Sequence, residues 1–226
     1  GNNTYTGNTV INSGTFLANN TAGSATGIGS VSTVTNSGAT LGGTGSISGG
    51  TAGSITINSG TQLRIGSTHG VAGGAGAQDF QLGQGGNVAI TLTGSLQFDL
   101  FGNEGDTTAA EADRLVINTT ASEIVLGGTI VVADVSGGSG WTSGVWQLID
   151  WSSLGSNPTR TGTFNFDFSA ALGSLADGYT WSTEDFLNSG TISVVAVPEP
   201  SRAVLLLLGT LAFLAQRRRP ASCSIV

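Results

Sequence analysis

The six residues Asn36-Ser37-Gly38-Ala39-Thr40-Leu41 form a pattern that returns along the chain at nearly constant spacing. The pattern is Asn-Ser-Gly, then two residues, then Leu. It occurs at 12–17, 36–41 and 58–63, with a weaker copy at 188–192. β-Branched residues precede each copy, and Asn and Gly tolerate positive φ, so each Asn-Ser-Gly predicts a tight turn between two strands.

This repeat predicts a β-solenoid. The glycines of the three turns are 24 and 22 residues apart, which suits one coil of such a fold. A single coil cannot bury its own apolar side chains, but stacked coils place like residues above one another about 4.8 Å apart. We therefore expect Leu17, Leu41 and Leu63 to form one buried ladder.

Strands are also predicted beyond the repeats. Apolar residues alternate with polar ones from Ile90 to Leu100, which indicates a half-buried strand or a strand pair bent at Gly94. The segment 66–86 is rich in Gly, Ala and Gln and is expected to be a loop, and the acidic segment 103–113 is expected to be a solvated connection. Short apolar runs predict strands at 115–118, 124–126, 130–133, 145–150, 164–168 and 191–197.

Aromatic residues distinguish the last third of the body. Four tryptophans gather there and predict a bulkier, β-rich cap over the end of the stack, where an exposed sheet would invite aggregation. A carbohydrate-binding role is an alternative, since sugars stack on aromatic faces. The four residues are Trp141, Trp146, Trp151 and Trp181.

The charge of the body restricts its partners. Residues 1–197 contain three arginines against thirteen Asp and Glu, so this part repels phosphate backbones and nucleic acid is not an expected partner. The single cysteine, Cys223, allows neither an internal disulfide nor a cysteine-based zinc site. Because the chain starts at Gly1 inside repeat-like sequence, we interpret it as a fragment or a processed product.

Catalytic patterns are absent from the sequence. His69 is the only histidine, no nucleophile elbow accompanies it, and it is expected to be a solvent-exposed loop residue. Among the acidic residues, a solvated loop is favoured over a calcium site. We therefore predict no catalytic residue, no metal and no cofactor. A polysaccharide-active enzyme remains the lesser alternative, because its chemistry needs only a positioned pair of acids.

The C-terminal tail has three parts in order: Pro198-Glu199-Pro200, an apolar run, and the basic stop Arg217, Arg218 and Arg219. As a helix the apolar run spans about 20 Å, less than the ~30 Å hydrocarbon core. It can insert if arginines snorkel and the bilayer thins, with the basic stop in the cytoplasm. The expected membrane anchor is Ala203, Val204, Leu205, Leu206, Leu207, Leu208, Gly209, Thr210, Leu211, Ala212, Phe213, Leu214 and Ala215.

These three parts resemble the tail of the PEP-CTERM family, the bacterial proteins handled by exosortases. The resemblance implies export, a transient or stable anchor in the inner membrane, and processing by an exosortase-type membrane protease near the recognition residues Pro198, Glu199 and Pro200. Delivery to the cell surface or to an exopolysaccharide matrix would follow. The extension 220–226 beyond the arginines departs from the family pattern. An ordinary C-terminal anchor is the alternative.

The first third, including the stretch from Gly7 to Thr15, resembles the autotransporter-associated β-strand repeat. That resemblance implies a right-handed parallel β-helix. No translocator barrel sequence follows, so self-translocation is not expected.

The expected organisation is therefore β-helix coils at 1–66, a β-rich continuation and cap at 67–197, and a sorting signal with a transmembrane helix at 198–219. The expected function is that of an exported, non-enzymatic structural or adhesive protein of the cell surface or extracellular matrix, with exopolysaccharide as a candidate partner.

Overall fold

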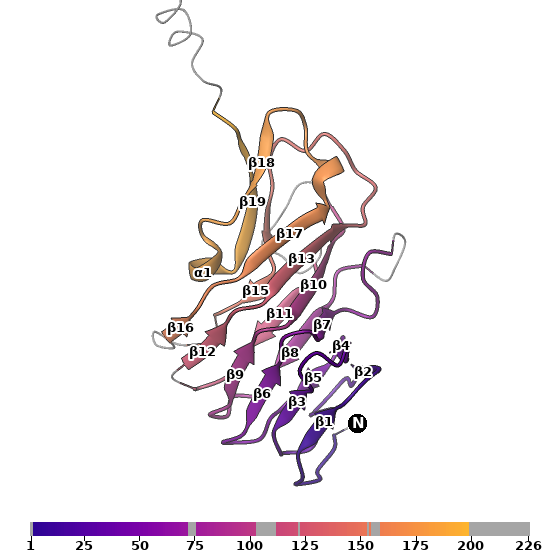
Figure 1. Cartoon of the computed structure of the whole chain (residues 1–226), viewed down its shortest axis with the longest axis vertical. Coiled ribbons are helices and arrows are strands. Elements are labelled where there is room, and N and C mark those ends of the chain that lie inside the picture. The colour runs from indigo at the N-terminus through magenta and orange to yellow at the C-terminus, as the bar shows by residue number, and fades with distance from the viewer. Residues whose placement is uncertain are drawn as a thin grey trace, which may run out of the picture. The chain divides into compact units, whose positions relative to one another are not determined.

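The computed structural model describes residues 2–71, 76–102, 112–121, 123–152, 154 and 159–198. The chain divides into two compact units, Gly1–Val195 and Ala196–Val226. The first unit is an all-β solenoid built from parallel sheets, with almost no helix (Figure 1). The predicted all-β solenoid class is thereby confirmed, whereas the predicted transmembrane segment lies outside the described residues.

Three parallel sheets form the solenoid. Sheet A is β1 (Thr9–Ile11), β3 (Val31–Thr33), β6 (Ser54–Ile57), β9 (Ala89–Leu92), β12 (Glu123–Leu126) and β16 (Thr159–Thr161). Sheet B is β2 (Thr15–Ala18), β4 (Thr40–Gly43), β7 (Gln62–Ile65), β10 (Ser95–Leu100), β13 (Thr129–Asp134) and β17 (Asn165–Ala170). Sheet C is β5 (Ser46–Ile47), β8 (Asp79–Leu82), β11 (Arg114–Ile117) and β15 (Ile149–Asp150).

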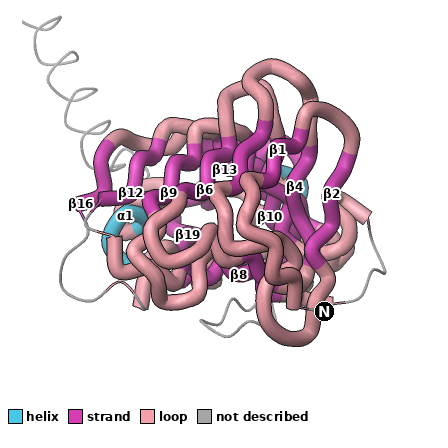
Figure 2. The backbone as a smooth tube through the Cα atoms, turned by 90° about the horizontal axis from the view of Figure 1, so that it is seen from below, coloured by secondary structure: helices cyan, strands magenta, loops and turns pink. Residues whose placement is uncertain are grey.

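Successive turns of the chain supply these sheets in rotation. Three uninterrupted turns, β3 to β5, β6 to β8 and β9 to β11, each give one strand to every sheet. Figure 2 shows β16, β12, β9 and β6 side by side along one wall. Each interior strand thus bonds to strands from the turns before and after it, which are more than twenty residues away in sequence.

A smaller sheet is formed by strands from the last third of the solenoid unit. It contains β14 (Val145–Gln147), β19 (Thr191–Ala196) and β18 (Tyr179–Ser182), with β14 antiparallel to β19. The short 3-10 helix η1 (Leu172–Ser174) and the one-turn helix α1 (Phe186–Ser189) lie in the same part of the chain.

In-register stacking of apolar side chains builds the core. Each sheet contributes an inner row of apolar residues in which every residue pairs with the equivalent residue of the next turn. The row of sheet B is Phe16, Leu41, Leu63, Leu96, Ile130 and Phe166. The row of sheet A is Val31, Ile55, Ile90 and Ile124. One row of sheet C is Phe80, Leu115 and Ile149.

The predicted leucine ladder is confirmed at Leu41 and Leu63 but is wrong at Leu17. Phe16 pairs with Leu41, while Leu17 pairs with Gly42 and is 41% exposed. The cause is turn length, since residues 12–14 join β1 to β2 whereas residues 34–39 join β3 to β4. The second connection is three residues longer, but its Asn-Ser-Gly starts only two residues later relative to the paired Ile11 and Thr33, so the two motifs end one residue out of register. A one-residue offset places a side chain on the opposite face of a strand.

The Asn-Ser-Gly turns form as predicted. Gly14, Gly38 and Gly60 have φ values of +74°, +68° and +73°, in the left-handed region that glycine enters without strain. Of the asparagines in these turns, only Asn36 has a positive φ, at +56°. Asn58 acts differently, because its backbone N–H donates to Thr33 Oγ1 at 2.9 Å and its side chain donates to the Thr33 carbonyl, which ties the turn to the preceding coil.

Most predicted strands are present. Those at 115–118, 124–126, 130–133, 164–168 and 191–197 correspond to β11, β12, β13, β17 and β19, and the segment 145–150 divides into β14 and β15. The predicted loop at 66–86 is wrong in part, because it contains β8, whose Phe80 and Leu82 are fully buried. Only two apolar side chains mark this strand, too few to stand out among Gly and Gln.

A pair of leucine substitutions tests the observed register. Leu63→Ala opens a cavity in the inner row of sheet B and should lower the free energy of unfolding by about 2–5 kcal/mol. Leu17→Ala removes an exposed side chain and should cost about 0.5 kcal/mol or less. Urea unfolding followed by circular dichroism measures both. Equal losses would show that Leu17 occupies the buried row after all.

Candidate functional site

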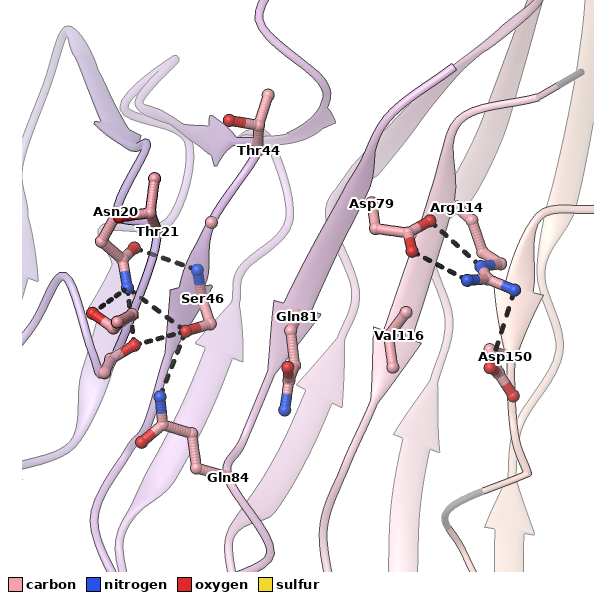
Figure 3. Close-up of a pocket in the computed structure, with 13 residues that line it drawn as sticks. Asn20, Thr21, Thr44, Ser46, Asp79, Gln81, Gln84, Arg114, Val116 and Asp150 are labelled. Atoms are coloured by element: carbon pink, nitrogen blue, oxygen red, sulfur yellow. Dashed lines mark hydrogen bonds and ion pairs between the residues drawn. The ribbon is translucent and has the colours of Figure 1, made fainter. Parts of the chain in front are cut away.

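A polar groove of about 560 Å³ lies on the outer face of sheet C and is hereafter the sheet C groove (Figure 3). Its volume lies within the ~300–1,000 Å³ range of ligand sites in proteins. It is lined by Asn20, Thr21, Ala22, Gly23, Thr44, Gly45, Ser46, Asp79, Gln81, Gln84, Arg114, Val116 and Asp150.

Strand alternation directs polar side chains into the groove. Asp79 and Gln81 flank the buried Phe80 on β8, so they point to the opposite face of the sheet. Arg114 and Val116 flank the buried Leu115 on β11 in the same way. Because the inner positions are occupied by core residues, the outer positions can hold polar side chains that face a ligand.

The segment that follows β2 forms one wall and is held by a hydrogen-bond network. The Asn20 side chain accepts from the Ser46 backbone N–H at 3.0 Å and donates to the Gly23 carbonyl at 2.6 Å. The Ser46 hydroxyl donates to the same carbonyl at 2.6 Å, and the side-chain amide of Gln84 donates to that hydroxyl at 3.1 Å. These bonds fix the wall to β5.

An arginine joins three strands at the other side of the groove. The Arg114 guanidinium donates to both Asp79 carboxylate oxygens, from Nε at 3.1 Å and from Nη2 at 2.8 Å, while Nη1 lies 3.9 Å from Asp150 Oδ2 (Figure 3). Hydrogen bonding and attraction from Asp79 raise the pKa of Arg114, against burial. The Asp79 side chain is 41% exposed, so the pair itself adds only about 0–1 kcal/mol to stability.

This arrangement suits hydrogen bonding to a polar ligand. Both carboxylate oxygens of Asp79 accept hydrogen bonds from Arg114, whereas a glycosidase needs two carboxyl groups that flank the scissile bond. Asp79 and Asp150 therefore give no support to the polysaccharide-active alternative.

A second polar cluster is buried beneath the loop between β7 and β8. Asp99 accepts from the Gly70 N–H at 2.9 Å, and His69 Nδ1 lies 2.7 Å from an Asp99 oxygen. Asp113 accepts from the Gln78 N–H at 2.9 Å and from the Asp99 N–H at 3.3 Å. The carboxyl pair therefore pins both ends of this loop to the solenoid.

Two expectations change because of this cluster. His69 was expected to be exposed, but its side chain is only 17% exposed and faces Asp99. Asp113 was expected in a solvated acidic loop, yet it is buried, while residues 103–111 lie outside the described part. Burial, aided by repulsion from Asp99, raises the pKa of Asp113 to about 8, even though the backbone N–H groups of Gln78 and Asp99 favour its charged form.

The predicted sorting residues lie almost wholly outside the described structure. Pro198 is described and exposed. Glu199, Pro200, the predicted anchor Ala203–Ala215 and the arginines 217–219 are not described. Among the described residues, no helix has the length and apolar character needed to cross a membrane. Over the same residues, no three His, Cys, Asp or Glu side chains are grouped to hold a metal ion.

The tryptophans belong to the core and do not form a sugar-stacking platform. Trp141 and Trp146 stack with ring centroids 5.1 Å apart, and Trp181 lies 5.3 Å from Trp146. Trp141, Trp146 and Trp151 are each at most 5% exposed, and Trp181 is half-buried. Because three of the four rings are buried in the core, the tryptophans give little support to the carbohydrate-binding alternative.

None of the groove residues was predicted as a site residue from the sequence. Asp79 and Arg114 are 35 positions apart and meet only because β8 and β11 pair in parallel register. The available signal was one polar residue on each side of a lone apolar one, as in Asp79-Phe80-Gln81, but recognising it requires first assigning β8 as a strand.

Comparison of the chain with protein-family models, curated proteins and solved structures gives no significant match.

The raised pKa of Asp113 predicts how stability depends on pH. The unfolded chain releases this proton near the ordinary pKa of 3.8 and the folded chain near 8. Between these values the folded state binds more protons, so the contribution of Asp113 is full below pH 4 and declines as the pH rises, by at most about 1.4 kcal/mol per unit. Asp113→Asn should flatten this decline in urea unfolding measured from pH 4 to 8.

Asp167→Asn is the matched control. The backbone and side chain of Ser169 bond to Asp167 and lower its pKa, so its contribution is lost only on acidification below the ordinary range. Its profile between pH 4 and 8 should run parallel to that of the unsubstituted chain. If Asp113→Asn also runs parallel, Asp113 is ionised throughout that interval.

Proposed function

We propose that this chain is an exported, non-enzymatic structural or adhesive protein of the cell surface or extracellular matrix, with the β-solenoid as its scaffold. One observation carries the proposal: successive turns stack in register over buried Ile and Leu rows, while the outer positions of the same strands are mostly Ser, Thr, Asn, Gln and Asp. Such a solenoid is a rigid support with wide polar faces.

Finer features of the scaffold form part of the same proposal. We take the coil to be right-handed, because crossovers between parallel strands of one sheet have that hand in about 98% of cases. The aromatic cluster would cap the last turn. In support, β17 is the edge strand of sheet B, and its Phe166 and Phe168 pack on Phe186 and Trp181 at 4.9 and 5.0 Å. Covering an edge in this way protects it from pairing with other chains.

Surface delivery would depend on the C-terminal signal. The first compact unit ends at Val195, and the exposed Val197 and Pro198 follow at once, so a membrane protease would reach the motif 198–200 without unfolding the solenoid. In this proposal the apolar run 203–215 lies in the inner membrane and the arginines 217–219 stay in the cytoplasm. The proposal keeps the predicted division into β-helix coils at 1–66, a continuation and cap at 67–197, and a sorting signal at 198–219.

Mass spectrometry of the mature C-terminus tests the proposal. The chain is produced in its native host, once unchanged and once with Pro198, Glu199 and Pro200 all replaced by Ala. The unchanged protein should end near residues 198–200 and appear in the surface or matrix fraction, whereas the variant should retain Val226 and stay with the membrane.

Pro220→Ala is the control, since it removes a proline from the same tail but outside the motif. It should be processed like the unchanged chain. Retention of Val226 by all three proteins would mean that the tail is an ordinary anchor, and the proposed sorting would be rejected.

A further inference from the structure

The sheet C groove has the periodicity of its sheet. Ser46, Gln81, Val116 and Asp150 follow one another across β5, β8, β11 and β15 in direct register. Neighbouring strands are about 4.8 Å apart, so this row presents one side chain at each such step. That spacing is comparable to the length of one pyranose residue in an extended glycan.

The groove also retains unused hydrogen-bonding groups. Within the described part of the chain, the hydroxyls of Thr21 and Thr44 and the side-chain carbonyl of Gln81 have no hydrogen-bond partner. The amide of Gln81 is held by the Gly83 carbonyl at 3.0 Å, which orients its oxygen. Hydroxyl and amide groups of this kind pair with sugar hydroxyls, which both donate and accept.

Charge excludes one large class of ligand. The groove holds two carboxylates, Asp79 and Asp150, and one guanidinium, Arg114, whose strongest contacts are already made to Asp79. The net charge of these three groups is negative, and the net charge of residues 1–197 is also negative. A polyanion such as a uronate chain would therefore be repelled on approach.

A peptide is a poor occupant for a different reason. Both edges of β8 and of β11 are already paired within sheet C, so a peptide cannot add to these strands through backbone hydrogen bonds. Val116 is the largest apolar side chain in the lining, which leaves little for an apolar side chain to pack against.

We propose that the sheet C groove binds an extended, neutral polysaccharide chain that lies across β5, β8, β11 and β15. Gln81 and the hydroxyls of Thr21 and Thr44 hydrogen-bond the sugar hydroxyls, and Val116 contacts the sugar ring. This inference rests on the proposed function, because a protein displayed in a matrix gains attachment by holding the matrix glycan. In this proposal the sugar-binding surface is the sheet C groove and not the tryptophan cluster.

The test measures glycan binding by the full 226-residue chain. An array of neutral and anionic oligosaccharides identifies the best ligand, and isothermal titration calorimetry with soluble neutral hexaoses, cellohexaose and laminarihexaose among them, gives Kd. Hexagalacturonate is the anionic probe. We expect a neutral hexaose to bind and hexagalacturonate to bind at least about tenfold more weakly.

Two matched substitutions locate the site. Val116→Trp fills the groove from an outer position of β11 and should weaken binding about tenfold or more. Val131→Trp places the same bulk on the outer face of sheet B and should leave Kd within about twofold. Gln81→Ala removes a hydrogen-bonding group without adding bulk and should weaken binding about threefold to tenfold. Thermal unfolding verifies that each variant folds.

Three results would overturn the proposal: no neutral glycan binds, hexagalacturonate binds as tightly as the neutral hexaose, or Val131→Trp weakens binding as much as Val116→Trp. These outcomes are separate from those of the sorting experiment, because glycan binding is measured on purified protein and processing is measured in the host. Normal processing with no glycan binding would reject the groove ligand alone.

Discussion

Stacking of like side chains between successive turns is the constraint on which the structure depends. A single turn of this chain is only a few short strands around a thin apolar interior, and it exposes one side of every buried Ile and Leu. The next turn covers that side and pairs its backbone with the first. Because register sets both the core rows and the backbone hydrogen bonds, the turn lengths must keep the strands aligned, and glycines such as Gly60 provide the tight corners that do so.

Much of the fold follows from local sequence. Alternation from Ile90 to Leu100 correctly predicted a strand pair that divides at Gly94, and the regular spacing of the Asn-Ser-Gly turns correctly predicted stacked coils. Leu17 was misplaced because its motif was aligned with the later copies by residue identity alone. The pairing of the strands depends also on the length of the connection before them. β8 was missed because two buried residues among glycines and glutamines are too few to show a period.

The candidate site was harder to predict than the fold. The groove residues on β5, β8, β11 and β15 occupy outer strand positions, where the core places no demand on their identity, and their partners come from other turns. Arg114 illustrates this, since its two acidic neighbours lie 35 positions before it and 36 positions after it. Such neighbours can be identified only when the register between the parallel strands is known. The buried Asp113 was misjudged for a related reason, because the acids around it in sequence suggested solvent, whereas it lies directly before β11 and is buried.

The direction of the hydrogen bonds between turns has a mechanical consequence. These bonds run from one coil to the next, so tension applied between the first and last coils loads them end-on and in series. Each coil contacts mainly its neighbours, and the weakest junction therefore opens first and releases one coil's length of chain before the next junction takes the load. A fibre or film that contained such molecules would yield in small steps and dissipate work gradually, where a domain with a single cooperative core would fail at once.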